Sequence, residues 1–234
     1  SNVTCIFTTN EVFDDLTTFT EIAEKGYKFK VIPAFRADKI MNCAARGYAG
    51  FIAKLADLTH PITSLTDLEK AVEKRLEEFK KVGTRASDIA VERVCPVTTE
   101  AADEVFKKAL TGGIITEGEE SVFKGYFTYF LMKLYAKHNI ATELHVGAMR
   151  NNNTVMLNKL GLDAGYDSIS EDNSIKNMSR LFDRLNSENA LPKTIVFNLN
   201  PKMNAEIMTL IGSFQSGEAR GKLQYGPAWW FLDN

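Results

Sequence analysis

Three polar side chains that suit ligand binding or catalysis lie in or beside short apolar runs of this 234-residue chain. Arg36 follows the apolar residues 31–35, Asp88 begins the run 88–94, and His145 lies between two apolar residues. A guanidinium group suits a planar carboxylate ligand, an imidazole suits a metal ion or proton transfer, and a carboxylate accepts protons. Together they would suit a site for a small ligand that carries a carboxylate.

Other polar residues stand where further strands are expected to end. Arg150 and three asparagines follow the run 142–148, and Trp229 follows the last apolar run. In a barrel of parallel strands the carboxyl ends share one mouth, so we expect these side chains to form one ring. The ring comprises Asn10, Glu11, Arg36, Asp38, Asp88, His145, Arg150, Asn151, Asn152, Asn153, Asn198, Asn200, Gln224, Trp229 and Trp230.

Each of these residues also has a structural explanation. Arg36 could simply pair with Asp38, and a histidine on an apolar strand is more often structural than a ligand or base. The asparagines beside Arg150 could cap the next helix. Trp229 could fill the core or stack on a sugar ring.

Two kinds of segment alternate along the chain and would position these residues. Runs rich in Val, Ile, Phe and Thr predict strands at 3–9, 29–35, 88–94, 142–148, 194–198 and 222–225. Segments with apolar residues every three or four positions predict helices at 14–24, 39–57, 65–82, 99–110, 117–138, 174–185 and 204–215. The helix at 65–82 is the clearest, with capping-box spacing at Thr66 and Glu69 and a stop at Gly83.

Alternating strands and helices predict an α/β fold with parallel strands joined by right-handed crossovers. Two architectures remain, an open doubly wound sheet and a closed barrel. The open sheet usually carries a glycine-rich turn after its first strand, and residues 8–11 read Thr-Thr-Asn-Glu instead. We therefore predict a (β/α) TIM-type barrel, incomplete at about six of eight βα units, in one domain spanning residues 1–234.

Composition excludes several classes of protein. The formal net charge of −2, with acids and bases mixed, offers no basic surface for nucleic acid or anionic lipid, and no apolar run reaches membrane-spanning length. Cys5, Cys43 and Cys95 are few and far apart, which favours a reducing compartment, so we expect a cytoplasmic protein. The chain starts at Ser1 and a predicted strand follows at once, so we expect an internal start and no signal peptide.

Several longer strings resemble one known family, the uronate (glucuronate) isomerases of the amidohydrolase superfamily. They are LHVGAMRNNNT at 144–154, GYDSI at 165–169, LPKTI at 191–195, GKLQYG at 221–226 and WWF at 229–231. The paired threonines at 8–9, the aspartates at 14–15 and AFRADK at 34–39 are similar to earlier family segments. The resemblance covers nearly the whole chain in matching order and spacing.

The resemblance implies an isomerase that interconverts D-glucuronate with D-fructuronate and D-galacturonate with D-tagaturonate. In such enzymes a proton leaves the carbon beside the aldehyde and returns to its neighbour through an enediol, with a divalent metal such as zinc near the site. By position, Arg36 would hold the uronate carboxylate, Arg150 and Trp229 would also contact substrate, and Asp88 and His145 would be catalytic. His145 would also be a metal ligand.

The chain departs from the family pattern at informative places. The family carries a His-x-His pair on its first strand and an Asp followed by an Arg on its last, and this sequence has neither. The six strands then correspond to the second through seventh, so we expect an internal fragment that is inactive and binds zinc poorly by itself. Ile89 replaces a family histidine beside Asp88, and Asn10 replaces an aspartate.

These departures leave alternatives open. One is a catalytically silent module of the same fold that binds a sugar acid or serves assembly, and another is a barrel enzyme with a different carbonyl substrate. Unpaired strand edges in an incomplete barrel would also favour association, so we expect a homo-oligomer.

Overall fold

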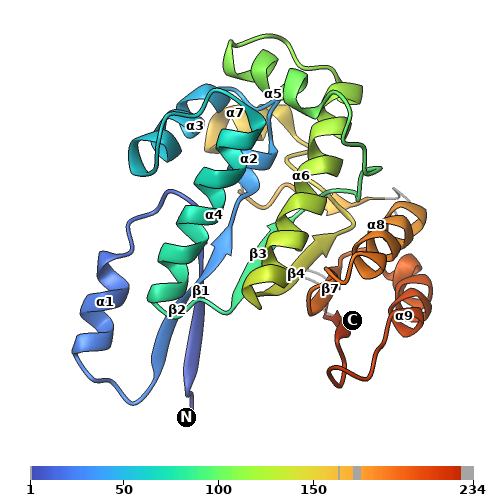
Figure 1. Cartoon of the computed structure of the whole chain (residues 1–234). Coiled ribbons are helices and arrows are strands. Elements are labelled where there is room, and N and C mark those ends of the chain that lie inside the picture. Colours follow the sequence, from blue (N-terminus) through green and yellow to red (C-terminus); the bar gives the residue numbers. More distant parts are fainter. Residues whose placement is uncertain (1, 163, 171–174, 228–234) are drawn as a thin grey trace.

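A six-stranded parallel sheet forms the centre of the computed structural model, which describes residues 2–162, 164–170 and 175–227 (Figure 1). The strands follow one another across the sheet in the order β1-β2-β3-β4-β7-β8. Their bounds are β1 Cys5–Glu11, β2 Lys30–Arg36, β3 Ala86–Ala90, β4 Ala141–Val146, β7 Thr194–Asn198 and β8 Leu223–Gly226. A separate two-stranded antiparallel sheet, formed by β5 Ala148–Met149 and β6 Ser168–Ile169, follows β4.

Helices fill the connections between the strands. They are α1 Thr17–Glu24, α2 Asp38–Met41, α3 Tyr48–Leu58, α4 Leu65–Lys81, α5 Ala102–Leu110, α6 Glu117–His138, α7 Thr154–Leu160, α8 Ile175–Ser187 and α9 Asn204–Ser213, with a 3-10 turn at Pro201–Met203. The long helices α4 and α6 cross the same face of the sheet (Figure 1). In the described ranges, no helix combines the length and apolarity that a membrane span requires.

The side-chain alternation of β2 separates the two faces of the sheet. Phe35 is fully buried and packs edge-to-face on Phe79 of α4 and Tyr135 of α6. Successive strand residues point to opposite faces, so Arg36 belongs to the face away from these helices, which we call the inner face. Ile89 of β3 is also fully buried, within the apolar core that the sheet forms with the helices.

The expected α/β architecture with six parallel strands is confirmed. A doubly wound sheet would reverse its strand order at a switch point, whereas here the order follows the sequence without reversal. Sequential parallel pairing of this kind is the pattern of a TIM-type barrel. In the described ranges the strands do not close, because β1 and β8 lie at opposite ends of the sheet.

Several predicted boundaries were wrong for local reasons. The helix expected at 39–57 is two helices, because Gly47 with a φ of 82° takes a left-handed conformation before α3. The capping box of α4 is made by Ser64 and Asp67 rather than by Thr66 and Glu69. The third strand begins two residues before Asp88 and ends at Ala90. The strands β5 and β6 were not predicted, and α7 was anticipated only as the helix that the asparagines could cap.

Candidate active site

Arg36, Asp88 and His145 meet on the inner face, although they come from three different strands. Arg36 Nη1 lies 3.7 Å from Asp88 Oδ2, and His145 Nδ1 lies 3.2 Å from Asp88 Oδ1. The register of β3 and β4 places Ala90 opposite His145, so Asp88 and His145 share a face two residues apart. Asp88 is therefore in the middle of its strand and the other two lie near strand ends.

The first strand reaches the same place, which shows how the sheet curves. Thr9 Oγ1 donates to Asp88 Oδ2 at 3.0 Å, although β2 lies between their strands. Two short side chains separated by a whole strand meet only if the sheet bends toward the inner face. We call Thr9, Glu11, Arg36, Asp88 and His145 the inner cluster.

Buried charges next to Arg36 determine its ionisation and that of its neighbours. Arg36 Nε donates to Asp38 Oδ2 at 2.6 Å, and Asp38 Oδ1 accepts from the Ala90 amide at 3.2 Å. Burial raises the pKa of Asp38 even though Arg36 opposes the rise. Burial alone would lower the pKa of Arg36, but the charges of Asp38 and Asp88 raise it overall. The expected Arg36–Asp38 pair is thus present together with the contact to Asp88.

Asp88 is the ionised member of the inner cluster. Burial would raise its pKa, but the hydrogen bond to His145 and the charges of His145 and Arg36 outweigh burial and lower the pKa. The His145 ring stacks on Phe197 of β7, with ring centroids 4.6 Å apart and planes within 8°. Asp88 and Phe197 together fix the orientation of the imidazole.

Glu11 is the inner-cluster residue to which the sequence assigned no role. It pairs in register with Arg36, its side chain is 15% exposed, and Oε1 lies 4.0 Å from Lys39 Nζ. Within the described residues, its buried Oε2 has no hydrogen-bond partner. Burial and the charge of Asp38 raise the pKa of Glu11 to about 7. Only the register with Arg36, which the sequence does not reveal, distinguishes it from an ordinary surface glutamate.

Arg150 and the asparagines beside it have structural partners. Arg150 Nη1 lies 2.7 Å from Asp167 Oδ2, and the Asn151 amide donates to Asp167 Oδ1 at 2.8 Å. Asn152 Nδ2 donates to Ser168 Oγ of β6 at 2.8 Å. Asn153 Oδ1 accepts from the Met156 amide at 3.1 Å and caps α7, as the capping alternative predicted.

A hollow lies beside β5 and β6, in the region after β4, and has both apolar and polar lining residues. Its volume is about 570 Å³, and it is lined by Met149, Asn152, Asn153, Thr154, Val155, Gly165, Tyr166, Asp167 and Ser168. A contact between Arg150 or Trp229 and a substrate remains a prediction. Trp229 and Trp230 lie outside the described residues.

Two of the departures from the family pattern, Ile89 and Asn10, are explained by their surroundings in the structure. Ile89 points into the core on the opposite face from Asp88, so its apolar side chain suits its surroundings. Asn10 Oδ1 accepts from Thr8 Oγ1 at 2.7 Å and its Nδ2 donates to Asp14 at 3.2 Å, which stabilises the turn after β1. Neither residue changes the inner cluster directly.

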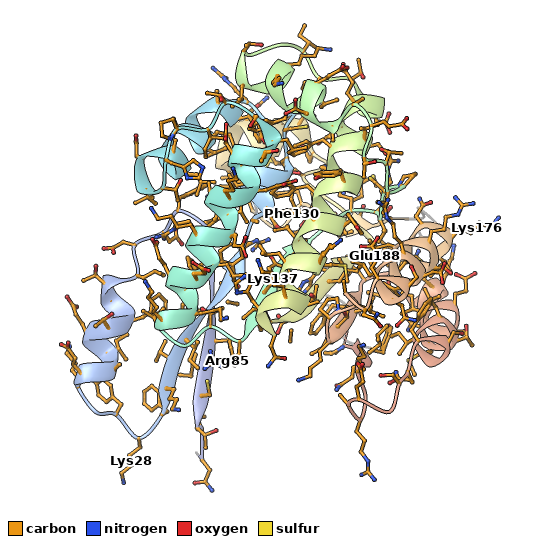
Figure 2. All side chains as sticks on the ribbon, viewed as in Figure 1. Lys28, Arg85, Phe130, Lys137, Lys176 and Glu188 are labelled. Atoms are coloured by element: carbon orange, nitrogen blue, oxygen red, sulfur yellow. The ribbon has the colours of Figure 1, made fainter. Side chains whose placement is uncertain are left out.

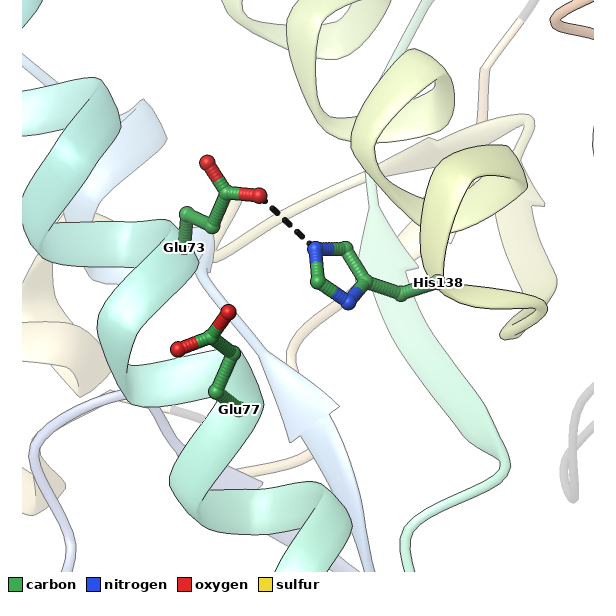
Figure 3. Close-up of side chains that lie close together, drawn as sticks. All are labelled: Glu73, Glu77 and His138. Carbon is green, nitrogen blue, oxygen red and sulfur yellow. Dashed lines mark hydrogen bonds and ion pairs between the residues drawn. The ribbon is translucent and has the colours of Figure 1, made fainter.

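A metal ion has no complete set of ligands on the inner face of the described chain. His145 and Asp88 are neighbours, but no third His, Cys, Asp or Glu in the described ranges joins them within ligand distance. The group of three potential ligands that the described residues do form is Glu73, Glu77 and His138, on the helix side of the sheet (Figure 3). The residues present thus do not fit a metal site at His145 by themselves.

Comparisons with known proteins point to one family. The family model described as glucuronate isomerase matches residues 1–234. Uronate isomerases from Caldanaerobacter subterraneus subsp. tengcongensis and Clostridium perfringens are 45% and 41% identical to this chain, and the matches cover 100% of the chain and 51% of each relative.

Solved structures show the same fold. A uronate isomerase from Thermotoga maritima superimposes with a TM-score of 0.89 at 24% identity, over 99% of this chain and 50% of that one. A glucuronate isomerase from Caulobacter crescentus gives a TM-score of 0.87 at 23% identity, over 98% and 47%. The chain therefore spans about half the length of the relatives it matches.

Proposed function

This chain belongs to the glucuronate isomerase family, and from that membership we propose that the protein interconverts D-glucuronate with D-fructuronate and D-galacturonate with D-tagaturonate. The chain spans about half of its relatives, so we assign this activity to the protein at the full length of the family and expect none from the 234 residues alone. The observation that supports the proposal is the meeting of Arg36, Asp88 and His145 on one face.

The reaction moves one proton from C2 to C1 of the sugar acid through an enediol, and the hydroxyl proton moves in the same direction, from O2 to O1. It needs a cation for the carboxylate and groups that take up and return protons. We assign the carboxylate to Arg36, whose guanidinium has five N–H donors, more than Asp38 and Asp88 use.

Asp88 and His145 are the proposed proton-transfer pair. The ionised Asp88 holds Nδ1 of the imidazole, as a carboxylate does when it orients a catalytic histidine. The other ring nitrogen would then exchange protons with the substrate. Arg150 and Trp229 are proposed substrate contacts after β4 and β8.

We also propose that the protein uses a divalent metal such as zinc, with His145 as one ligand. Asp88 holds Nδ1, so only Nε2 could bind the metal, and a metal at Nε2 would replace the proton-transfer role of His145. A bound metal would polarise the carbonyl oxygen of the sugar. Because the described residues do not complete its coordination on the inner face, no step of the reaction is assigned to it here.

Calorimetry with D-glucuronate on the 234-residue chain tests the carboxylate site. We expect binding by the wild type and at least about tenfold weaker binding by Arg36→Ala, since a charge-assisted bidentate pair contributes more than 1.4 kcal/mol. Arg85→Ala is the matched control, because the exposed Arg85 directly precedes β3 at the amino end of the sheet, and in Figure 2 it is labelled below the lower ends of α4 and α6. Equal binding by both variants would contradict the assignment.

Turnover separates the isomerase from the alternative of a silent module that binds sugar acids. A full-length protein should convert D-glucuronate to its ketose, followed by NMR as the loss of the anomeric signals. Binding without conversion at full length would support the silent module. The incomplete set of metal ligands on the inner face of the described chain is the reason to keep the silent-module alternative.

Self-association and location are further proposals. The edges of β1 and β8 have no strand partner in the described part of the chain, so we propose a homo-oligomer, which light scattering at high concentration would test. The three cysteines are free, which suits the cytoplasm we propose as its location.

A further inference from the structure

A histidine and two glutamates meet where α4 runs beside the end of α6, on the face of the sheet opposite the inner cluster (Figure 3). Glu73 and Glu77 lie one turn apart on α4, a spacing that places both carboxylates on one side of the helix. His138 is the last residue of α6, and its Nε2 lies 2.8 Å from Glu73 Oε1. One ligand atom from each of the three residues lies within 4.8 Å of the others.

We propose that Glu73, Glu77 and His138 form a binding site for a divalent transition metal such as Zn²⁺. Imidazole nitrogen and carboxylate oxygen are both common zinc ligands, and three protein ligands leave the fourth tetrahedral position to water. The His138 side chain is only 10% exposed and Glu73 is 30% exposed, so the site is seated between two packed helices. Glu77 is on its solvent side, which leaves an entry path.

Glu73 is ready to bind a cation at neutral pH. The hydrogen bond from Lys137 lowers the pKa of Glu73, and the hydrogen bond from His138 lowers it further.

The two helices that carry the proposed ligands are each anchored in the core. Helix α4 buries Leu76 and Phe79, and α6 buries Phe127. Core packing of α4 and α6 therefore sets the positions of the three ligand residues, without a need for contacts among those residues.

Two lysines, Lys137 and Lys80, contact two of the proposed ligands, so a metal ion must displace them when it binds. Lys137 Nζ lies 2.6 Å from Glu73 Oε1, between α4 and α6 (Figure 2), and Lys80 Nζ lies 3.2 Å from His138 Nδ1. An ammonium only donates, so Nδ1 accepts and Nε2 carries the imidazole proton. When a metal takes Nε2, that proton passes through solvent to Nδ1, and the Lys80 ammonium moves away.

The lysines therefore weaken the site without removing it. Lys137 is 66% exposed and Lys80 is half-buried, and both have long flexible side chains that reach water when displaced. Removing either lysine should tighten metal binding, because the metal then displaces one cation fewer. A polar contact with a purely structural role would not give that result.

Calorimetry with ZnCl₂ on the metal-free 234-residue chain tests the proposal, and the visible spectrum of added Co²⁺ reports on tetrahedral nitrogen and oxygen ligands. We expect one ion per chain. His138→Ala, Glu73→Gln and Glu77→Gln should each weaken binding at least about tenfold, because loss even of a group that only supports a metal ligand costs about 10- to 100-fold in affinity. Lys137→Ala should tighten it severalfold.

His60→Ala, in the segment before α4, is the matched histidine control, and Glu104→Gln, an exposed glutamate of α5, is the matched carboxylate control. Both should bind zinc as the wild type does. Loss of binding in His145→Ala with binding intact in His138→Ala would overturn the proposal, and so would a folded wild type that binds no zinc. If His138→Ala does not fold, Glu77→Gln alone decides, since Glu77 is exposed. None of these outcomes depends on the proposed isomerase activity.

Discussion

Two regions of the molecule hold a histidine next to carboxylates, and the surroundings give the two groups different properties. In the inner cluster, Asp88 and His145 project from neighbouring strands and are 13% and 14% exposed. At the junction of α4 and α6, Glu73 and His138 project from two helices, and Glu73 also pairs with the exposed Lys137. The two histidines are similarly buried, at 14% and 10% exposed, and the difference lies in the carboxylates, since Asp88 is 13% exposed and Glu73 is 30% exposed.

The difference appears in the pKa values. Burial raises the pKa of Glu11 to about 7 and also raises that of Asp38, both close to Arg36. At the helix junction the hydrogen bond from Lys137 lowers the pKa of Glu73 instead. The pKa of Asp88, the carboxylate beside His145, is lowered as well, so the contrast is between Glu11, whose pKa lies near neutral pH, and Glu73, which stays ionised and suits cation binding. This comparison predicts large effects of substitution in the first region and small ones in the second.

Removal of Asp38 should have the largest effect on stability. Asp38→Ala takes away the partner of a partly buried arginine and the acceptor of the Ala90 amide. Breaking a buried pair in this way lowers the free energy of unfolding by about 3 kcal/mol, measured by urea denaturation. A loss no larger than that of Glu73→Gln would remove the distinction between the two regions.

Glu11→Gln should change the pH dependence of stability. The pKa of Glu11 is about 7 in the folded chain and 4.5 in a model compound. The folded chain therefore binds this proton more tightly, and the free energy of unfolding falls as pH rises from 4.5 to about 7. Without the carboxylate this fall is absent.

Relative to wild type, Glu11→Gln should therefore gain on the order of 2 to 3 kcal/mol between about pH 4.5 and about pH 8. Urea denaturation at both pH values measures the gain, with Glu104→Gln as the exposed control. A constant difference between Glu11→Gln and wild type across this range would show that Glu11 titrates normally.

Thr9→Val tests whether the bend of the sheet depends on one hydrogen bond. The substitution removes the bond to Asp88 while it keeps the shape of the side chain. We expect a loss of about 1 kcal/mol in the free energy of unfolding, the usual net contribution of such a bond. Amide exchange of β1 would reveal whether the strand loosens. No change in either measurement would mean that the main-chain ladder alone maintains the bend.

Glu73→Gln should have the smallest effect in the absence of metal. Its ion pairs with Lys137 and His138 are partly exposed, and such pairs contribute below about 1 kcal/mol. Salt near 1 M should reduce even this small loss, because screening acts over about 3 Å at that concentration. A loss comparable to that of Asp38→Ala would make the helix junction a structural element of equal importance.

Much of the fold could be predicted from local patterns. The apolar periodicity of 117–138 predicted α6 with its observed bounds, and the run 194–198 predicted β7. The errors at Gly47 and Ser64 have a shared cause, since neither a backbone with positive φ nor a cap two residues earlier changes the apolar period of the helix. The polar residues Arg36, Asp88 and His145 were also identified from their strands alone.

The sequence by itself determined the order of strands and helices, the family, and which strand residues are polar, because these follow from side-chain type and spacing along one chain. The tertiary structure alone decided that Thr9 reaches Asp88 across an intervening strand, that Glu11 is buried beside Arg36, and that His138 meets Glu73 from 65 residues away. Such meetings depend on sheet curvature, strand register and helix packing, which are properties of several segments together and leave no periodic pattern in any one of them.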